Sequence, residues 1–233
     1  MKETSRANQV VYIVSLIILS AGLLQLASKA VLITTIGIVL LGFPLLLDER
    51  VRKIKFVGGA LIITFITLIN VTQISSFKKR YVSEFKDDLS DISMSNTIPE
   101  PRVVRWKSAL ALVDKSFIIG YGSGSERNLL KERYFEDKLF NSYLHELNAH
   151  NQYLSFLLKN GIIGLAIFLL TLYMGFVSAW RTRNIVFISF LLLISIVSFS
   201  ENILDVNKGI FFYAFFFTFF IKTGNDFKSQ PAA

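Results

Sequence analysis

The chain of 233 residues contains no cysteine, which excludes disulfide bonds and removes the commonest ligand of structural zinc sites. It has only two histidines and four prolines, and 17 acidic residues stand against 25 Lys and Arg. Apolar residues are abundant instead: they make up 52% of the chain, with 22 Phe and a mean hydropathy of +0.51. Because a soluble domain of this length cannot bury so much apolar surface, the composition predicts an integral membrane protein.

Six apolar runs are long enough, or nearly so, to cross a hydrocarbon core of about 30 Å as helices of roughly 17 to 25 residues. They are 10–27, 30–47, 56–74, 161–180, 185–200 and 204–221. The fifth run is short, and the sixth carries Asp205 and Lys208 at its start, so we expect protein rather than lipid around that end. The sequence thus predicts an all-α membrane protein with about six transmembrane helices and one long extracytoplasmic, mostly helical loop.

Lys and Arg are unevenly distributed over the short connections: ten lie on one side, and only Lys29 and Lys208 on the other. Short cytoplasmic loops retain such residues, so both termini are predicted to be cytoplasmic. The predicted order is three spans in 1–75, an extracytoplasmic loop domain in 76–160, three spans in 161–222 and a cytoplasmic tail in 223–233. Because topology explains the basic residues, we expect no binding of nucleic acid.

Three parts of the loop have helical spacing. We predict an amphipathic helix at 76–92, a second helix at 102–115 and a third from about 142 to 159, ended by a break at Asn160-Gly161. The stretch 120–124 is rich in glycine but lacks the Gly-Lys-Ser/Thr ending of a phosphate loop. We interpret Gly122 and its neighbours as a turn that lets the backbone approach a ligand or a neighbouring helix.

Arg102 and Arg105 stand in the first turn of the second predicted helix, where positive charge opposes the helix dipole. A bound anion would compensate, although solvated surface arginines are an alternative interpretation. His150, beside Asn151 at the end of the polar loop, is either a base for a substrate hydroxyl or an inert surface histidine. His145 precedes it by five positions, about 140° around a helix, which does not suit a shared metal ion.

Several motifs follow one another in the outer part of the chain. They are Arg102-x-x-x-Trp106, Gly120-x-Gly122, His150-Asn151-x-Tyr153-Leu154 and Asn160-Gly161-Ile162-x-Gly164, then Glu201 and Gly209-Ile210-Phe211-Phe212. In this order and topology they resemble the O-antigen ligase and polymerase superfamily of bacterial envelope enzymes. The resemblance extends over most of the chain, from about residue 28 to residue 220.

Members of that superfamily transfer a glycan from undecaprenyl pyrophosphate to an acceptor hydroxyl, outside the cytoplasm and without ATP. The resemblance implies that His150 is the general base and that Arg102 binds the donor pyrophosphate, with no metal or other cofactor. A second pyrophosphate-binding arginine of the family corresponds to Lys29, which keeps the charge but not the bidentate fork; a simple interfacial lysine is the alternative. Glu201 orients His150 or an arginine, or forms hydrogen bonds at a helix end.

Members of the superfamily usually have more spans than the six predicted here, and this chain corresponds to their catalytic half. We therefore expect a further N-terminal half or a partner subunit, besides membrane lipids, a lipid-linked glycan donor and a lipid A-core or other glycan acceptor. The predicted function is an O-antigen ligase type of glycosyltransferase in the bacterial inner membrane, with its active loop in the periplasm. The alternatives are an O-antigen polymerase, a protein oligosaccharyltransferase of the same superfamily, or a non-catalytic membrane component.

Overall fold

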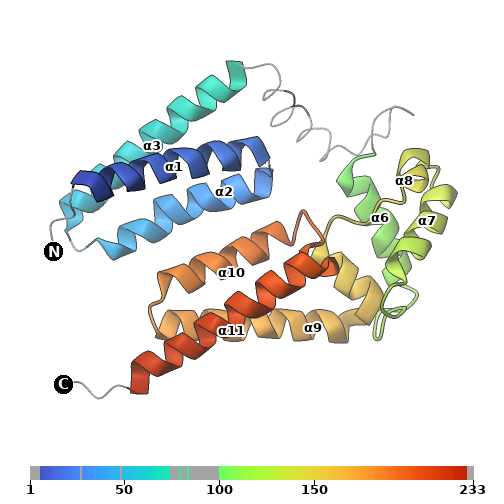
Figure 1. The fold of residues 1–233 in the computed structure, drawn as a ribbon. Coiled ribbons are helices and arrows are strands. Elements are labelled where there is room, and N and C mark those ends of the chain that lie inside the picture. The colour runs from blue at the N-terminus through green and yellow to red at the C-terminus, as the bar shows by residue number, and fades with distance from the viewer. Residues whose placement is uncertain are drawn as a thin grey trace. The chain divides into compact units, whose positions relative to one another are not determined.

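The computed structural model describes residues 6–26, 28–47, 49–73, 79, 83 and 100–229. Every regular element in these ranges is a helix, which confirms the predicted all-α class. The chain divides into two compact units, Met1–Tyr81 and Val82–Ala233, and each is described by itself (Figure 1). The amphipathic helix predicted at 76–92 lies outside the described residues, except for Lys79 and Ser83.

The first unit contains three apolar helical segments. They are α1 (Arg6–Leu26), α2 (Lys29–Gly37), which continues through a π-helical turn (Ile38–Gly42) and a 3-10 turn (Phe43–Leu46), and α3 (Arg50–Gln73). Ser28 caps α2, because its hydroxyl oxygen accepts a hydrogen bond from the Val31 amide at 3.4 Å. These segments coincide with the apolar runs predicted at 10–27, 30–47 and 56–74.

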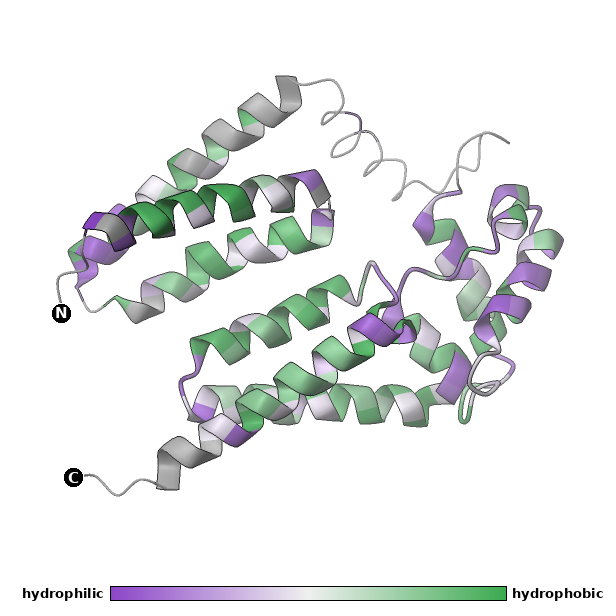
Figure 2. Cartoon of the chain, in the orientation of Figure 1, coloured by the Kyte–Doolittle hydropathy of each residue, from purple (hydrophilic) through white to green (hydrophobic). Residues whose placement is uncertain are grey.

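The second unit combines a polar group of helices with an apolar one (Figure 2). The polar helices are α6 (Arg102–Val113), α7 (Glu126–Glu136) and α8 (Phe140–Leu144). The apolar helices are α9 (Gln152–Arg181), α10 (Ile185–Val197) and, after a 3-10 turn (Ile203–Asp205), α11 (Asn207–Ser229). The second predicted helix is therefore present as α6, whereas α7 was not predicted.

The helix predicted from about 142 to 159 is wrong in its first half. Helix α8 ends at Leu144, and α9 begins only at Gln152. Between them Glu146 and His150 have positive φ angles of 48° and 47°, which a right-handed helix cannot contain. The side chain of Asn151 then caps α9 and fixes its first residue.

Helix α9 is the one helix in the described part of the chain that is long and apolar enough to cross a membrane. Shorter apolar helices lie at Asn8–Leu23, Lys29–Gly42 and Ile185–Val197. Helices thus occupy all six of the apolar runs, but six membrane crossings remain a prediction.

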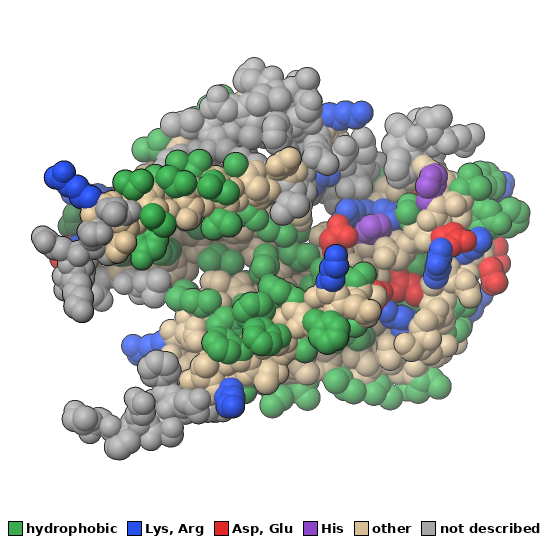
Figure 3. Space-filling model, in the orientation of Figure 1, with side chains coloured by type: hydrophobic (Ala, Val, Ile, Leu, Met, Phe, Trp, Pro, Cys, Tyr) green, Lys and Arg blue, Asp and Glu red, His purple; other side chains and the backbone are tan. Residues whose placement is uncertain are grey.

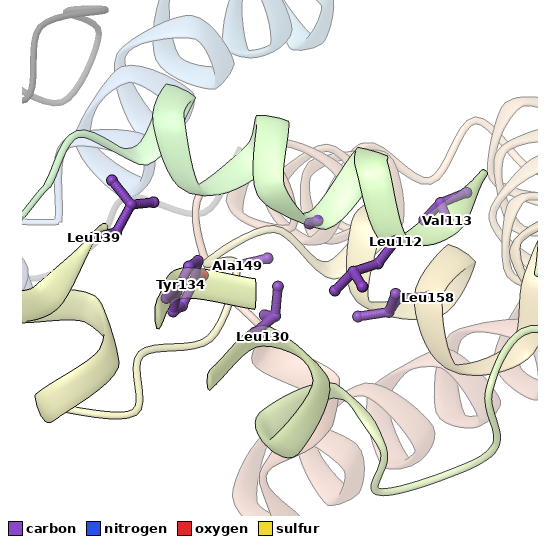
Figure 4. Packing of buried hydrophobic residues seen from close by; sticks show 8 residues of the cluster. Leu112, Val113, Leu130, Tyr134, Leu139, Ala149 and Leu158 are labelled. Carbon is purple, nitrogen blue, oxygen red and sulfur yellow. The ribbon is translucent and has the colours of Figure 1, made fainter. Parts of the chain in front are cut away.

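Two hydrophobic clusters hold the second unit together. The first joins α6, α7 and the start of α9, with Leu130 and Tyr134 fully buried between Leu112, Leu139 and Leu158 (Figure 4). The second joins α9, α10 and α11, and its rings form a continuous series of contacts; for example, Phe187 stacks on Phe220 at 5.2 Å between centroids. The polar helices therefore have a core of their own and are also anchored on α9.

Gly161 breaks α9 with φ 63° and ψ −166°, as predicted for Asn160-Gly161. The loop after α6 supplies the hydrogen bonds that the break removes from the second half of the helix. The amides of Ile162 and Ile163 donate to the carbonyls of Phe117 and Ile118, at 2.8 and 3.5 Å. A β-carbon on Gly161 would lie 2.1 Å from the Ile118 oxygen, so only glycine allows this approach.

The glycine-rich turn donates hydrogen bonds to the carbonyls that the break leaves without a helical partner on its N-terminal side. The amides of Tyr121 and Gly122 donate to the carbonyls of Leu158 and Lys159, at 3.0 and 2.8 Å. Gly120 has a φ of 69°, and a β-carbon there would lie 2.5 Å from the carbonyl carbon of Lys159. The turn thus brings backbone against a neighbouring helix, which was one of the two roles predicted for it.

Candidate functional site

His150 lies in a loop whose backbone carbonyls accept hydrogen bonds from side chains of α6. Its left-handed φ of 47° disfavours a residue with a β-carbon by roughly 1–2 kcal/mol. The Trp106 indole N–H donates to the Ala149 carbonyl at 2.8 Å, and Arg105 Nη1 donates to the Asn148 carbonyl at 3.2 Å. The side chain of Asn148 in turn accepts from the His150 amide at 3.0 Å. These contacts fix the strained residue in one conformation.

The residues that follow His150 attach the loop to the end of α10. Asn151 caps α9 by accepting from the Tyr153 amide at 3.0 Å, while its own amide donates to Asn202 Oδ1 at 2.7 Å. The Gln152 amide donates to the Ser198 carbonyl at 2.8 Å. The two residues after His150 are therefore bonded to residues on either side of Glu201.

Glu201 connects His150 to Arg102. Its Oε2 lies 3.2 Å from His150 Nδ1, and its Oε1 accepts from Arg102 Nη2 at 3.3 Å. Arg102 Nη1 also donates to the Ser200 carbonyl at 2.6 Å. Glu201 therefore contacts both the histidine and the arginine that the sequence offered as its partners, and its role stays a prediction. All three side chains are partly exposed, with 30% of the His150 side chain accessible to solvent.

The charges of this group determine which nitrogen of His150 can act. Burial opposes ionisation of Glu201, but its hydrogen bond with His150 and the charge of Arg102 outweigh this and lower its pKa. An ionised carboxylate accepts hydrogen bonds only, so Nδ1 of His150 carries the hydrogen. In a neutral imidazole Nε2 then holds the lone pair, which is the arrangement that a general base needs.

Behind this group lies a buried carboxylate that the sequence interpretation missed. Glu126, at the start of α7, accepts from the Ala149 amide and from Asn202 Nδ2, both at 3.2 Å. It also accepts from the Ser155 hydroxyl and forms an ion pair with Lys159, with 3.8 Å between the charged atoms. One carboxylate thus contacts the residue before His150 and the residue after Glu201.

Asp205 extends this network to the start of α11. It accepts from Lys159 Nζ at 2.5 Å, from Gln152 Nε2 at 3.1 Å and from Asn202 Nδ2 at 3.0 Å. The expectation that Asp205 lies against protein is therefore confirmed. No local pattern could have revealed the network, because the bond between Asn202 and Glu126 joins positions 76 residues apart.

The other predicted site residues occupy different places. Arg105 is only 4% exposed, and it donates a hydrogen bond to the loop before His150. Gly122 contributes its amide to the break in α9, and Asn151 caps that helix. Lys29 is the first residue of α2 in the other unit, so its proposed contact with pyrophosphate stays a prediction.

Charged side chains and the histidines gather at the polar end of the second unit, whereas hydrophobic ones predominate along α9 to α11 (Figure 3). A shallow hollow of about 410 Å³ is lined by Glu132, Phe135, Glu136 and Tyr143, and thus by none of the residues predicted to be catalytic. Within the described ranges, no three His, Asp or Glu side chains are grouped so that they could hold a metal ion.

The second unit joins apolar helices to polar ones, and α9 is long and apolar enough to cross a membrane, which is typical of a membrane protein. Residues 14–169 match the family described as O-Antigen ligase, and the chain belongs to that family. Proteins of this family reside in the bacterial inner membrane. The matched range includes His150 and Arg102, whereas Glu201 lies beyond it.

A related protein, described as uncharacterized, occurs in Haemophilus influenzae (strain ATCC 51907 / DSM 11121 / KW20 / Rd). It is 29% identical over 178 residues, which cover 68% of this chain and 45% of that protein. The chain therefore spans less than half the length of this relative. No solved structure matches the chain.

Proposed function

We propose that the chain carries the catalytic site of a glycosyltransferase of the O-antigen ligase type. The donor is a glycan on undecaprenyl pyrophosphate, and the acceptor is a sugar hydroxyl, such as one on the lipid A core. Membership of the O-antigen ligase family supports the reaction class. The observation that carries the assignment of residues is the contact of one carboxylate, Glu201, with both His150 and Arg102.

On the acceptor side, Nε2 of His150 takes the hydroxyl proton while the acceptor oxygen attacks the anomeric carbon of the donor sugar. Glu201 accepts from Nδ1–H, which orients the ring and stabilises the imidazolium ion that forms. The partly exposed ring at the end of a polar loop suits a base that must reach a substrate.

On the donor side, the bond between the anomeric carbon and the pyrophosphate oxygen breaks, and negative charge develops on the leaving group. The guanidinium of Arg102 neutralises that charge, so the reaction proceeds without a metal ion. Lys29 supplies a second positive charge in this proposal. Arg105 supports the His150 loop, because it is buried and bonded to the Asn148 carbonyl.

The test is transfer of glycan from its lipid carrier in membranes that contain the protein. His150→Ala removes the base and should reduce the rate about 10²- to 10⁴-fold. Arg102→Ala should also abolish most of the transfer, whereas Arg102→Lys keeps the charge and should retain part of it.

Two variants serve as matched controls. His145→Ala removes the other histidine, which is exposed and forms a ring hydrogen bond with the Asn141 carbonyl in its own turn. Arg127→Ala removes an exposed arginine that pairs with Glu146. Both should transfer at the wild-type rate. Unchanged transfer in His150→Ala or Arg102→Ala at normal expression would contradict the mechanism.

The product distinguishes a ligase from a polymerase of the same superfamily. Loss of a ligase leaves full-length glycan on its lipid carrier, whereas loss of a polymerase shortens the glycan. We expect the first outcome for His150→Ala, and a shortened glycan would assign the same residues to a polymerase.

A further inference from the structure

Three consecutive large apolar side chains are exposed on the polar half of the second unit. They belong to the loop after α6: Phe117 is 49% exposed, Ile118 64% and Ile119 71%. Leaving such side chains in water forgoes roughly 25 cal/mol for every Å² of apolar surface that could be buried. Since Phe117 and Ile118 bond to α9 through their backbone carbonyls, the exposed parts of their side chains remain available for another environment.

The loop is fixed at one point along α9. The carbonyls of Phe117 and Ile118 accept from the first two amides after the break at Gly161, those of Ile162 and Ile163. The close approach at Gly161 leaves no space between the loop and the helix. The exposed side chains therefore lie at the level where the second half of α9 begins.

That level is one end of a helical stretch whose length matches the thickness of the hydrocarbon core of a bilayer. From residue 162 to residue 181 the helix has about 20 residues, and at 1.5 Å per residue it spans about 30 Å, the thickness of a hydrocarbon core. Its apolar surface starts at this level, since Ile163 and Ile167 are exposed. The loop thus continues the apolar surface of α9 at the outer boundary of the predicted membrane.

A positive charge also lies beside the apolar residues of the loop, as is typical of segments at a membrane interface. Lys115, two residues before Phe117, is exposed and can reach lipid phosphates while the apolar residues lie deeper. The predicted topology places this end of α9 outside the cytoplasm. Among the polar helices, the exposed Leu144 at the end of α8 provides a comparison, because the amide that follows it donates within its own helix, to the Asn141 carbonyl at 3.0 Å.

We infer that Phe117, Ile118 and Ile119 insert into the outer leaflet of the inner membrane, at the boundary between headgroups and acyl chains. Their bonds to α9 make the insertion depth a fixed property of the fold. The loop therefore anchors the polar helices, and the His150 loop with them, at a set height on the bilayer. This inference rests on α9 crossing the membrane and is independent of the transfer reaction.

The absence of cysteine allows a direct test with single cysteines. Ile118→Cys in the full chain is labelled with an environment-sensitive nitrobenzoxadiazole and reconstituted in nanodiscs of phosphatidylethanolamine and phosphatidylglycerol. We expect blue-shifted emission, loss of most of the emission when lipids carry a doxyl group near the headgroup, and protection from aqueous iodide. Leu144→Cys, 72% exposed, is the matched control and should show the reverse pattern.

Ile119→Cys is a second variant of the same loop. With two variants, the result does not depend on one that folds poorly. Quenching of both loop labels by iodide would overturn the inference, since the loop would then face water. Protection from both iodide and doxyl lipid would also overturn it and would indicate a protein partner instead. Transfer activity is measured separately on the labelled proteins, so a failure of the proposed reaction leaves this result unaffected.

Discussion

Glu201 is shared between an imidazole and a guanidinium group, so the orientation of the proposed base depends on the proposed anion-binding residue. The two oxygens of its carboxylate contact different partners, His150 on one side and Arg102 on the other. A group that contacts both can transmit a change at the donor pyrophosphate to the base. In the proposed mechanism Glu201 is thus a positioning residue, which acts through its two neighbours.

Glu201→Gln tests this role at the level of a single residue. The amide can still accept from Nδ1–H through its oxygen, but its NH₂ group then faces the donors of Arg102. We expect transfer to fall on the order of tenfold or more, but by less than in His150→Ala. Glu201→Asp, which keeps the charge, should restore part of the rate; equal rates for wild type and Glu201→Gln would contradict the role.

The same variant should also change how stability depends on pH. Because the fold lowers the pKa of Glu201, the ionised group stabilises the folded state. That stabilisation is complete above the ordinary value of 4.5 and is lost as the pH falls through the lower value of the folded protein. Melting temperatures of the solubilised protein should therefore differ between wild type and Glu201→Gln at neutral pH and converge in acid.

The sequence indicated His150, Arg102 and Glu201 but missed the buried carboxylate of Glu126. His150, Arg102 and Glu201 were recognisable because their motifs resemble those of a family. Glu126 has no such motif and lies in a polar helix without a clear apolar stripe, so nothing local marks it as buried. Its role depends on contacts with segments that are distant in the chain, and residue types alone do not predict those.

Among the elements, α9 has an unusual construction, because a second segment completes its hydrogen bonds. The break at Gly161 leaves free carbonyls on one side and free amides on the other, and residues 117–122 satisfy both. Helix α6, which carries Arg102, leads directly into this segment. The helix that carries Arg102 is thus attached to α9 at its other end, through the segment that follows it.

Gly161→Ala should disturb this construction. The new β-carbon would meet the Ile118 carbonyl, and the left-handed backbone adds roughly 1–2 kcal/mol of strain. We expect a lower melting temperature together with reduced transfer. Gly59→Ala in α3 is the control, since a β-carbon there meets nothing within 4 Å and the variant should be neutral or slightly stabilising. Equal melting temperatures for the two variants would contradict the assignment.

Some of the helices could be predicted from the periodic spacing of apolar residues, and others could not. The helices α6 and α9 to α11 follow from apolar spacing, and the break at Gly161 follows from the Asn-Gly pair. The non-helical stretch before Asn151 does not follow from spacing, since its residues are compatible with a helix. It forms because the side chains of Trp106, Arg105 and Glu126 bind its backbone, and these are contacts of tertiary structure.

For the whole molecule, the main prediction is the direction in which the helices cross the membrane. Basic residues in the short connections predict that both ends of the chain lie in the cytoplasm and the His150 loop in the periplasm. The structure is compatible with this, because the last turn of α10 and the first turns of α9 and α11 meet at the polar end (Figure 1).

Cysteine labelling in cells can test the topology. We expect Leu144→Cys to react with a membrane-impermeant maleimide once the outer membrane is permeable, because its side chain is exposed on the periplasmic domain. Lys222→Cys, exposed on α11 near the predicted cytoplasmic end, should react only after the inner membrane is lysed. The unchanged chain is the blank, since it has no thiol. The opposite pattern would contradict the predicted topology.

Helix α10 is much shorter than the part of α9 that follows the break at Gly161. Its 13 residues extend for about 20 Å, whereas α9 after its break extends for about 30 Å. Where a hydrophobic segment is shorter than the hydrocarbon core, local thinning of the bilayer is one way to accommodate the difference. We therefore expect a local depression of the outer leaflet beside the end of α10, where Ser200 binds Arg102. A lipid pyrophosphate lying in that depression would approach the arginine without being lifted out of its leaflet.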